Sequence, residues 1–361
     1  MKALRSIFPW ILWLLLGSIG VFSQPIPISR VEAIGFTVSD MDRSVDYYTR
    51  VLHFQKVSDM ERSGASVERF KGLFGVRMRV VRLRLGQEEL ELSEYIAPQG
   101  PALPLNFQSN DLSFQHVAIV VSEMDQAYAW LRQNHVQHVS SGPQTLPAWN
   151  QQAGGIQAFY FKDPDGHVLE IIHFPTGKGD PRWQHPSGEL FEGIDHTAIA
   201  VSDTEKSLAF YKDRLGMRIT GTSENYGDEQ EHLNNVYGAR LRITSLRALH
   251  GPGVELLEYL VPKTGQPIPE DRKANNLAHW ETLVNEEDIK AAWTYFKDNH
   301  IRLISVGVEG IDGDAPDART GFLLEDPDGH VIAALSNAAT GRAAMTGAAA
   351  SLNHTQKRHE K

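Results

Sequence analysis

The stretch "FKDPDGHVLEII" at residues 161–172 returns near the other end of the chain as "LEDPDGHVIAAL" at residues 324–335. Pro and Gly in the shared DPDG segment suit a tight turn, and apolar residues flank that turn on both sides. Each copy therefore predicts two strands paired through a hairpin. Among the differences between the copies, one replaces a carboxylate: Glu170 of the first is matched by Ala333 in the second.

The hairpin belongs to a longer repeat. The segment "VSDMDRSVDYY" starting at Val38 matches "VSDTEKSLAFY" starting at Val201, and His116 recurs as His279, with the same separation of 163 residues that relates the two DPDGH turns. Two domains of one ancestral plan are therefore predicted, residues 30–178 and 190–337. The Gly- and Pro-containing segment "TGKGDPRWQHPSGE" links them.

Each domain divides again into two modules of about 80 residues. The segment "HVAIVVSEMDQAYAW" from His116 has the same apolar run, acidic turn and helical spacing as "HTAIAVSDTEKSLAFY" from His196. Acidic residues suit the start of a helix, and alternating apolar residues after it indicate strands. The chain is predicted to hold four modules, each with the order β-α-β-β-β.

Composition limits the classes of function. A chain of 361 residues is long enough for two domains, and its formal charge of −10 argues against nucleic acid or an anionic membrane as a partner. The absence of Cys excludes disulfides and thiol chemistry. The remaining expectation is a small-molecule substrate, with a monomer or a homodimer both compatible with four modules in one chain.

Residues 1–23 have the pattern of a secretory signal peptide, with Lys2 and Arg5 before an apolar run and small or polar residues after it. The expected location is therefore periplasmic or secreted. An uncleaved membrane anchor is the alternative, although the apolar run is short for a spanning helix. At the other end, residues 338–361 are rich in small and charged residues and are predicted to be disordered.

The repeat resembles the vicinal oxygen chelate (VOC) superfamily, which includes glyoxalases, bleomycin-resistance proteins and extradiol dioxygenases. The resemblance rests on the strand-start His before V-S-D, the helix with its aromatic pair and the DPDGH turn before the last strand. It implies an α+β fold in which four βαβββ modules pair into two half-barrel domains. In that family, metal ligands project into each half-barrel, or cup, from the first and last strands of the modules.

Carried onto this sequence, the family pattern gives one ligand position on each first strand and one on each last strand. With modules paired within each domain, the N-terminal cup would offer Glu91, His116 and Glu170. The C-terminal cup would offer His196, Glu255 and His279. Ala33 and Ala333 occupy the two remaining positions, so each cup would lack one ligand.

The C-terminal set is the preferred metal site of the sequence. Two imidazoles and one carboxylate suit Fe2+, and they also tolerate Mn2+, Ni2+, Co2+ or Zn2+. Glu255 and Tyr259 share one face of a strand with period 2, so both are candidate catalytic residues, Tyr259 as a nearby hydroxyl. For Glu91, a solvated strand end is an alternative, and an isolated His on an apolar strand is more often packed than ligating.

Two functions follow from different classes. The first is a metal-dependent VOC enzyme, an isomerase, lyase or dioxygenase, that chelates neighbouring oxygens of a small substrate on the metal. Ala333 argues against ring cleavage, because the resemblance places the carboxylate of extradiol dioxygenases at that position. The second is a non-catalytic protein that sequesters a small ligand, as bleomycin-resistance proteins do, which the two alanines would tolerate.

Overall fold

A computed structural model describes residues 27–185, 187–312 and 319–336. The predicted signal peptide, residues 1–23, and the predicted disordered tail, residues 338–361, lie outside the described residues. Within the described ranges, no helix is both long enough and apolar enough to cross a membrane.

The four modules have the predicted order, with a further short helix in the first and third and a further two-residue strand, β7 (Gln144–Thr145), in the second. The first module contains β1 (Arg30–Val38), α1 (Met41–Arg50), β2 (Gln55–Ser63), α2 (Ala65–Lys71), β3 (Arg77–Leu85) and β4 (Glu88–Ala97). The second contains β5 (Gln115–Val121), α3 (Met124–Gln133), β6 (Gln137–His138), β7 (Gln144–Thr145), β8 (Gln157–Lys162) and β9 (Val168–His173). After the short 3-10 helix η1 (Pro181–Gln184), the third contains β10 (Phe191–Val201), α4 (Thr204–Tyr211), β11 (Arg218–Tyr226), α5 (Asp228–Asn234), β12 (Arg240–Arg247) and β13 (Gly253–Val261). The fourth contains β14 (Trp280–Asn285), α6 (Ile289–Asp298), β15 (Glu309–Gly310), β16 (Thr320–Glu325) and β17 (Val331–Leu335).

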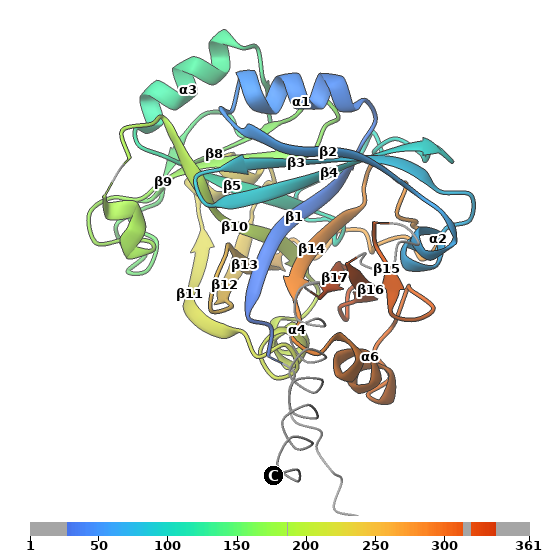
Figure 1. The fold of residues 1–361 in the computed structure, drawn as a ribbon. Coiled ribbons are helices and arrows are strands. Elements are labelled where there is room, and N and C mark those ends of the chain that lie inside the picture. Colours follow the sequence, from blue (N-terminus) through green and yellow to red (C-terminus); the bar gives the residue numbers. More distant parts are fainter. Residues whose placement is uncertain (1–26, 186, 313–318, 337–361) are drawn as a thin grey trace, which may run out of the picture.

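The modules pair differently from the expectation. Sheet A joins the first and fourth modules in the order β15-β16-β17-β14-β1-β4-β3-β2. Sheet B joins the second and third modules in the order β11-β12-β13-β10-β5-β9-β8-β6. The first strands meet antiparallel at the centre of each sheet, β1 against β14 and β5 against β10 (Figure 1). Pairing of modules within residues 30–178 and within 190–337 was therefore wrong for the cups.

The sequence did not reveal this pairing because the first strands of the four modules are chemically similar. Every first strand is an apolar segment that can lie beside any other first strand, so the repeat alone does not select a partner. Modules that follow each other in the chain still touch. The Tyr48 hydroxyl of α1 donates to Asp163 in the turn after β8, and the Tyr211 hydroxyl of α4 donates to Asp326, both at 3.1 Å.

The DPDGH segments form the predicted hairpin turns, between β8 and β9 and between β16 and β17. In the first, Asp163 accepts hydrogen bonds from the backbone N–H of Asp165 and of His167, each at 2.9 Å. The His167 imidazole lies 2.9 Å from the same carboxylate. His167 therefore stabilises the turn, and both of its ring nitrogens have partners.

Alternation along the strands separates a core face from a cup face. On β5, Val117, Ile119 and Val121 belong to the main hydrophobic core, which includes residues of both sheets and of the helices beside them. The intervening His116 and Ala118 belong to the opposite, concave face. The two sheets therefore share one core and turn their cups away from it.

The fourth module is offset by two residues from the expected alignment. Ala33, His116 and His196 each stand seven residues before the N-cap of the following helix, at Asp40, Glu123 and Asp203. The fourth helix has its N-cap at Asp288, and seven residues before it stands Glu281. The sheets agree, because Glu281 pairs with Gly35 in sheet A as His116 pairs with Ala198 in sheet B. The position given to His279 therefore belongs to Glu281.

The offset also buries a carboxylate. Glu286, two residues before its helix N-cap, takes the place that Val121 has in the second module. It is 2% exposed, and its Oε1 has no hydrogen-bond partner among the described residues. Burial, with a smaller contribution from Glu287, raises the pKa of Glu286 to about 8. Folding therefore opposes ionisation of this side chain at neutral pH.

Replacing Glu286 by Gln is expected to raise the free energy of unfolding at pH 7 by roughly 2–3 kcal/mol. The folded pKa is raised, so the wild type loses stability as pH rises from about 4.5 to about 8, and the difference between the proteins shrinks toward pH 4.5. Urea unfolding across this pH range measures it. The exposed neighbour Glu287 supplies the control E287Q, and an equal gain in both variants would contradict the prediction.

Candidate metal centre

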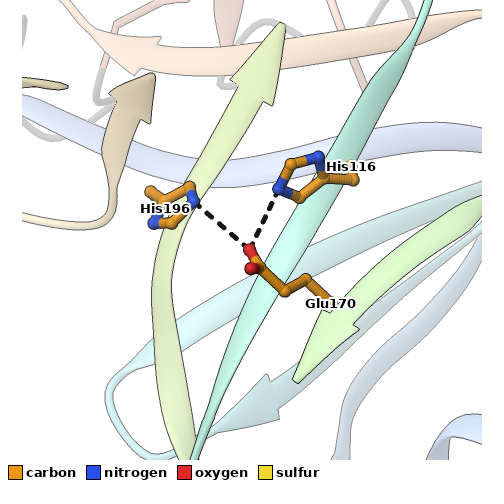
Figure 2. A group of neighbouring side chains, drawn as sticks. All are labelled: His116, Glu170 and His196. Atoms are coloured by element: carbon orange, nitrogen blue, oxygen red, sulfur yellow. Dashed lines mark hydrogen bonds and ion pairs between the residues drawn. The ribbon is translucent and has the colours of Figure 1, made fainter. Parts of the chain in front are cut away.

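Three buried side chains converge in the cup of sheet B, from strands of two modules (Figure 2). His116 stands on β5, Glu170 on β9 and His196 on β10. Oε2 of Glu170 lies 3.1 Å from Nε2 of His116 and 3.6 Å from Nε2 of His196. One potential ligand atom from each residue lies within 4.8 Å of the others, a spacing that suits a shared metal ion.

Glu255 on β13 is the fourth member of this group. Its Oε2 lies 3.4 Å from Nε2 of His196, and its Oε1 accepts a 2.5 Å hydrogen bond from the hydroxyl of Ser245. With a side chain 21% exposed, against 5% or less for the other three, Glu255 is the most accessible of the four. The cup of sheet B therefore brings together two imidazoles and two carboxylates, each from a different strand.

A β-bulge orients His196. Neighbouring residues of a regular strand point to opposite faces, but the register of β10 against β5 shifts between Ile194 and His196. Asp195 consequently lies beside His196, with its Oδ2 2.9 Å from Nδ1 of the imidazole. Its Oδ1 accepts from Nε1 of Trp183 at 2.6 Å and from Arg247 at 2.7 Å. Nδ1 is thus occupied, and Nε2 is left to face the two glutamates.

The local charges alter the ionisation of His196. Burial opposes a charged imidazole, but Glu255, Asp195 and Glu170 outweigh it and raise the pKa of His196 to about 9. Asp195 itself is held ionised, because its partners His196 and Arg247 lower its pKa against the effect of burial. Without a metal, His196 is therefore protonated at neutral pH, and a metal ion must displace that proton.

Metal affinity is expected to fall by about tenfold for each pH unit below about 9, because the ion binds only the neutral imidazole of His196. Competition titrations of Zn2+ against a chelator of known pH dependence measure the slope between pH 7 and 9. The chain has no Cys, so no thiol adds to the signal. An affinity independent of pH over this range would contradict the assignment of His196 as a ligand.

The charge balance of this cup fits a cation. Among the described residues, the only ion-pair partners of Glu170 and Glu255 are histidines, and neither lies within 4 Å of a Lys or Arg nitrogen. Two buried or partly buried carboxylates that share one neighbourhood repel each other unless a positive charge compensates them. A divalent ion held by His116, Glu170, His196 and Glu255 would supply that charge. The donor set also matches the borderline metals that bind imidazole and carboxylate.

A pocket of about 550 Å³ opens beside these ligands. Glu170, His196 and Glu255 line it together with apolar side chains that include Leu146, Ile156, Ile172, Phe174, Leu233 and Ile243. A cavity of this size accommodates a small organic molecule, and its wall also includes charged side chains such as Lys178, Arg218 and Arg247. The arrangement allows a substrate to place polar atoms on the metal and its apolar part against the wall.

The cup of sheet A has the same geometry but different residues. The four ligand positions, after the two-residue correction, hold Ala33, Glu91, Glu281 and Ala333. Glu91 is 4% exposed and lies 3.3 Å from Nη1 of Arg62 and 2.8 Å from Nε of Arg82. These two cations hold the pKa of Glu91 far below its usual range although burial opposes this. Both oxygens of Glu91 are therefore engaged by arginines, and its role as a metal ligand stays a prediction.

Equivalent strand positions show how the two cups diverged. Arg82 pairs with Glu91 across β3 and β4, as Ser245 pairs with Glu255 across β12 and β13. A neutral hydroxyl beside the carboxylate in sheet B is thus replaced by a guanidinium in sheet A. Two features of sheet A disfavour a metal ion. Two alanines stand at ligand positions, and arginine side chains already supply the positive charge beside the carboxylate.

His279 lies with this second group and not with His196. Its Nε2 is 2.9 Å from Oε1 of Glu281, which also accepts from Nζ of Lys71 at 2.6 Å. Burial lowers the pKa of His279, and the hydrogen bond and negative charge of Glu281 oppose this. The predicted grouping of His196, Glu255 and His279 was wrong for this reason. The structure instead joins His116 and Glu170 to His196 and Glu255.

Tyr259 stands four residues after Glu255 on β13, but it is not among the residues that line the pocket. It accepts a 2.7 Å hydrogen bond from the Asn234 amide, and burial raises its pKa well above the usual range. The hydroxyl stays neutral and its role in catalysis remains a prediction. Reasoning from the sequence missed Asp195 and Ser245, because a bulge and a cross-strand neighbour leave no periodic signal.

Comparison with known proteins agrees with the fold and with the repeat. The family model of the Glyoxalase/Bleomycin resistance protein/Dioxygenase superfamily matches residues 30–171 and again residues 193–334. The resemblance stated from the sequence is thereby confirmed. Both matches follow the repeat along the chain, whereas the cups form between the repeats.

Two relatives match single stretches of the chain. A 2-epi-5-epi-valiolone epimerase from Actinomyces is 32% identical over 152 residues, which are 41% of this chain and 80% of the relative. The metallothiol transferase FosB of Staphylococcus epidermidis is 27% identical over 146 residues, 40% of this chain and 81% of the relative. Among solved structures, glyoxalase I from Zea mays shares the fold with a TM-score of 0.55 and 16% identity, covering 91% of this chain and 97% of that one.

Proposed function

Because the chain belongs to the Glyoxalase/Bleomycin resistance protein/Dioxygenase superfamily, we propose that it is a metal-dependent isomerase or epimerase. Its substrate is a small molecule that offers two neighbouring oxygens. The single observation that carries the proposal is the cluster of His116, Glu170 and His196, with Glu255 beside His196. Among the described residues, neither carboxylate has a Lys or Arg partner. The similarity to an epimerase supports the choice of reaction.

The number of ligands favours proton transfer over reaction with O₂. If all four side chains hold the ion, they would leave it room for few further ligands, enough for two oxygens of one substrate. An oxygenase with a two-His, one-carboxylate set leaves three positions open, which accommodates substrate and O₂ together. A divalent ion held here would polarise a substrate carbonyl and so acidify the neighbouring C–H bond.

Glu255 is the residue best placed to move the proton. It is the least buried of the four, it lines the pocket, and its Oε1 is held by the Ser245 hydroxyl. Its Oε2 lies 3.4 Å from Nε2 of His196 and would bind the metal, so Oε1 is the atom left to accept a proton from the substrate. Glu170, which is buried against both histidines, would hold the metal throughout. The two carboxylates thus have different roles because their environments differ.

The test measures exchange of carbon-bound hydrogen with solvent. Protein loaded with Mn2+, Ni2+, Co2+, Zn2+ or Fe2+ is incubated in D₂O with a panel of α-hydroxycarbonyl compounds and followed by NMR. Deuterium incorporation beside the carbonyl that requires metal and disappears in Glu255→Gln supports the proposal. Tyr259→Phe is run in parallel. Tyr259 is not among the residues that line the pocket, so loss of its hydroxyl should change the exchange rate little.

The alternative of a non-catalytic, ligand-sequestering protein gives a different result. Such a protein would bind a panel compound without exchanging its hydrogen, and affinity would survive His116→Ala with His196→Ala. A metal-free protein that takes up none of the five ions would exclude the metal-dependent enzyme altogether. Either result would replace the proposed function.

A further inference from the structure

A basic pocket lies next to the cup of sheet A, where the metal position has been lost. Its volume is about 190 Å³. Its cationic lining residues are Lys71, Arg272, Lys273 and Arg302, and its single carboxylate is Glu325. The remaining wall includes His279 and apolar or small residues. The lining is therefore strongly positive, although the chain as a whole carries a formal charge of −10.

Two of the four cations already have counter-ions. Nζ of Lys71 lies 2.6 Å from Oε1 of Glu281, and Nε of Arg302 lies 2.9 Å from Oε2 of Glu325. In each pair the carboxylate is buried or nearly so, and its negative charge compensates the positive charge of its partner. Lys71 and Arg302 are therefore neutralised. The other two cations, Arg272 and Lys273, need a separate counter-ion.

Arg272 and Lys273 have no carboxylate within 4 Å among the residues that the structure describes. Arg272 is only partly exposed and donates one hydrogen bond, from Nη2 to the backbone oxygen of Gly329. Burial lowers the pKa of Arg272, and the nearby Arg302 lowers it further, while Glu325 and Asp326 oppose this. A guanidinium has five N–H donors, and hydrogen bonds to other described residues use only one of those of Arg272, which lines the pocket.

We propose that the basic pocket binds a small oxyanion, a carboxylate or a phosphate, between the guanidinium of Arg272 and the ammonium of Lys273. A planar guanidinium matches the oxygens of either group, and an ammonium adds a point charge. A pocket of about 190 Å³ has room for such an anion. The two cups then take ligands of opposite charge, a cation in sheet B and an anion beside sheet A.

The test titrates inorganic phosphate, and separately acetate, into the full protein by calorimetry at constant ionic strength set with chloride. One saturable site per chain is expected for at least one of the two ions. Arg272→Gln and Lys273→Gln should each weaken binding by about tenfold, because each removes one charge-assisted contact. Lys273 is exposed, so its replacement tests the site without disturbing the packing.

Two control variants locate the bound anion. Arg50→Gln removes one exposed guanidinium that does not line the pocket and should leave the affinity unchanged. His196→Ala disables the metal cup, so binding that survives in this variant does not arise from an anion on a metal in sheet B. Absence of saturable binding, or equal affinity in the wild type, Arg272→Gln and Lys273→Gln, would overturn the proposal. A loss of binding only in His196→Ala would overturn it as well, and would leave the proposed enzyme function untouched.

Discussion

Replacing His196 by alanine is expected to remove the bound metal, whereas the same change at His279 is expected to leave it in place. Both histidines are buried, but His196 faces Glu170 and Glu255 in sheet B, and His279 faces Glu281 in sheet A. Loss of one of the proposed ligands, together with the gap that the missing imidazole leaves, should leave the site nearly empty. Elemental analysis of protein purified in parallel gives the metal content per chain.

Activity should follow the metal. If the ion supplies several kcal/mol of transition-state stabilisation, the rate in His196→Ala falls by about 10³-fold or more, and His279→Ala retains most of it. Near-UV circular dichroism of both variants checks that packing is intact. A His279→Ala protein without metal, next to a His196→Ala protein that keeps it, would show that the cups have been assigned to the wrong sheets.

Replacing Arg82 by serine is expected to lower the free energy of unfolding by about 3–5 kcal/mol, because the change leaves Glu91 without its nearest buried cation. The guanidinium is largely buried and contacts Glu91, Glu89 and Glu32. Serine is the residue found at the equivalent place in the other sheet, Ser245, so the side chain itself suits this strand position. Denaturant unfolding at pH 7 measures the loss.

Arg84 supplies the matched control two residues further along β3. It is exposed and pairs with Glu89 at 2.7 Å, so Arg84→Ser should cost less than about 1 kcal/mol. Adding Glu91→Gln to Arg82→Ser should recover part of the stability, because it removes a buried carboxylate that is then left with Arg62 alone. Equal losses at positions 82 and 84 would show that burial of the pair does not matter.

The module plan could be predicted because it rests on local patterns. The DPDGH turn, the apolar first strand and the acidic helix start each leave a signal within a dozen residues, and all of them are found in the structure. Five of the six proposed ligand positions, all but His279, were also placed on the correct strands. His279 was misplaced because the V-N-E sequence was matched to V-S-D, although the fourth module has two more residues before its helix N-cap.

The pairing of modules and the chemistry of each cup depended on information that is not local. Nothing in β1 itself indicates that its neighbour is β14 and not β5, since both partners are apolar and of similar length. The burial of Arg62 and Arg82 beside Glu91 could not be predicted, because period 2 does not tell which face of a strand is covered. Asp195 points to the same side as His196 only because of the bulge.

The crossed pairing also sets the order in which the chain can fold while it is being synthesised. Sheet B needs only residues 115–261, so its cup can close as soon as that stretch has left the ribosome. Sheet A must wait, because β1 has no central partner until β14, about 250 residues later, is made. During that interval the first module presents an unpaired strand edge. The strands of the first module, β1 to β4, are therefore the part of the nascent chain most exposed to wrong pairing. The cup of sheet B is expected to form first.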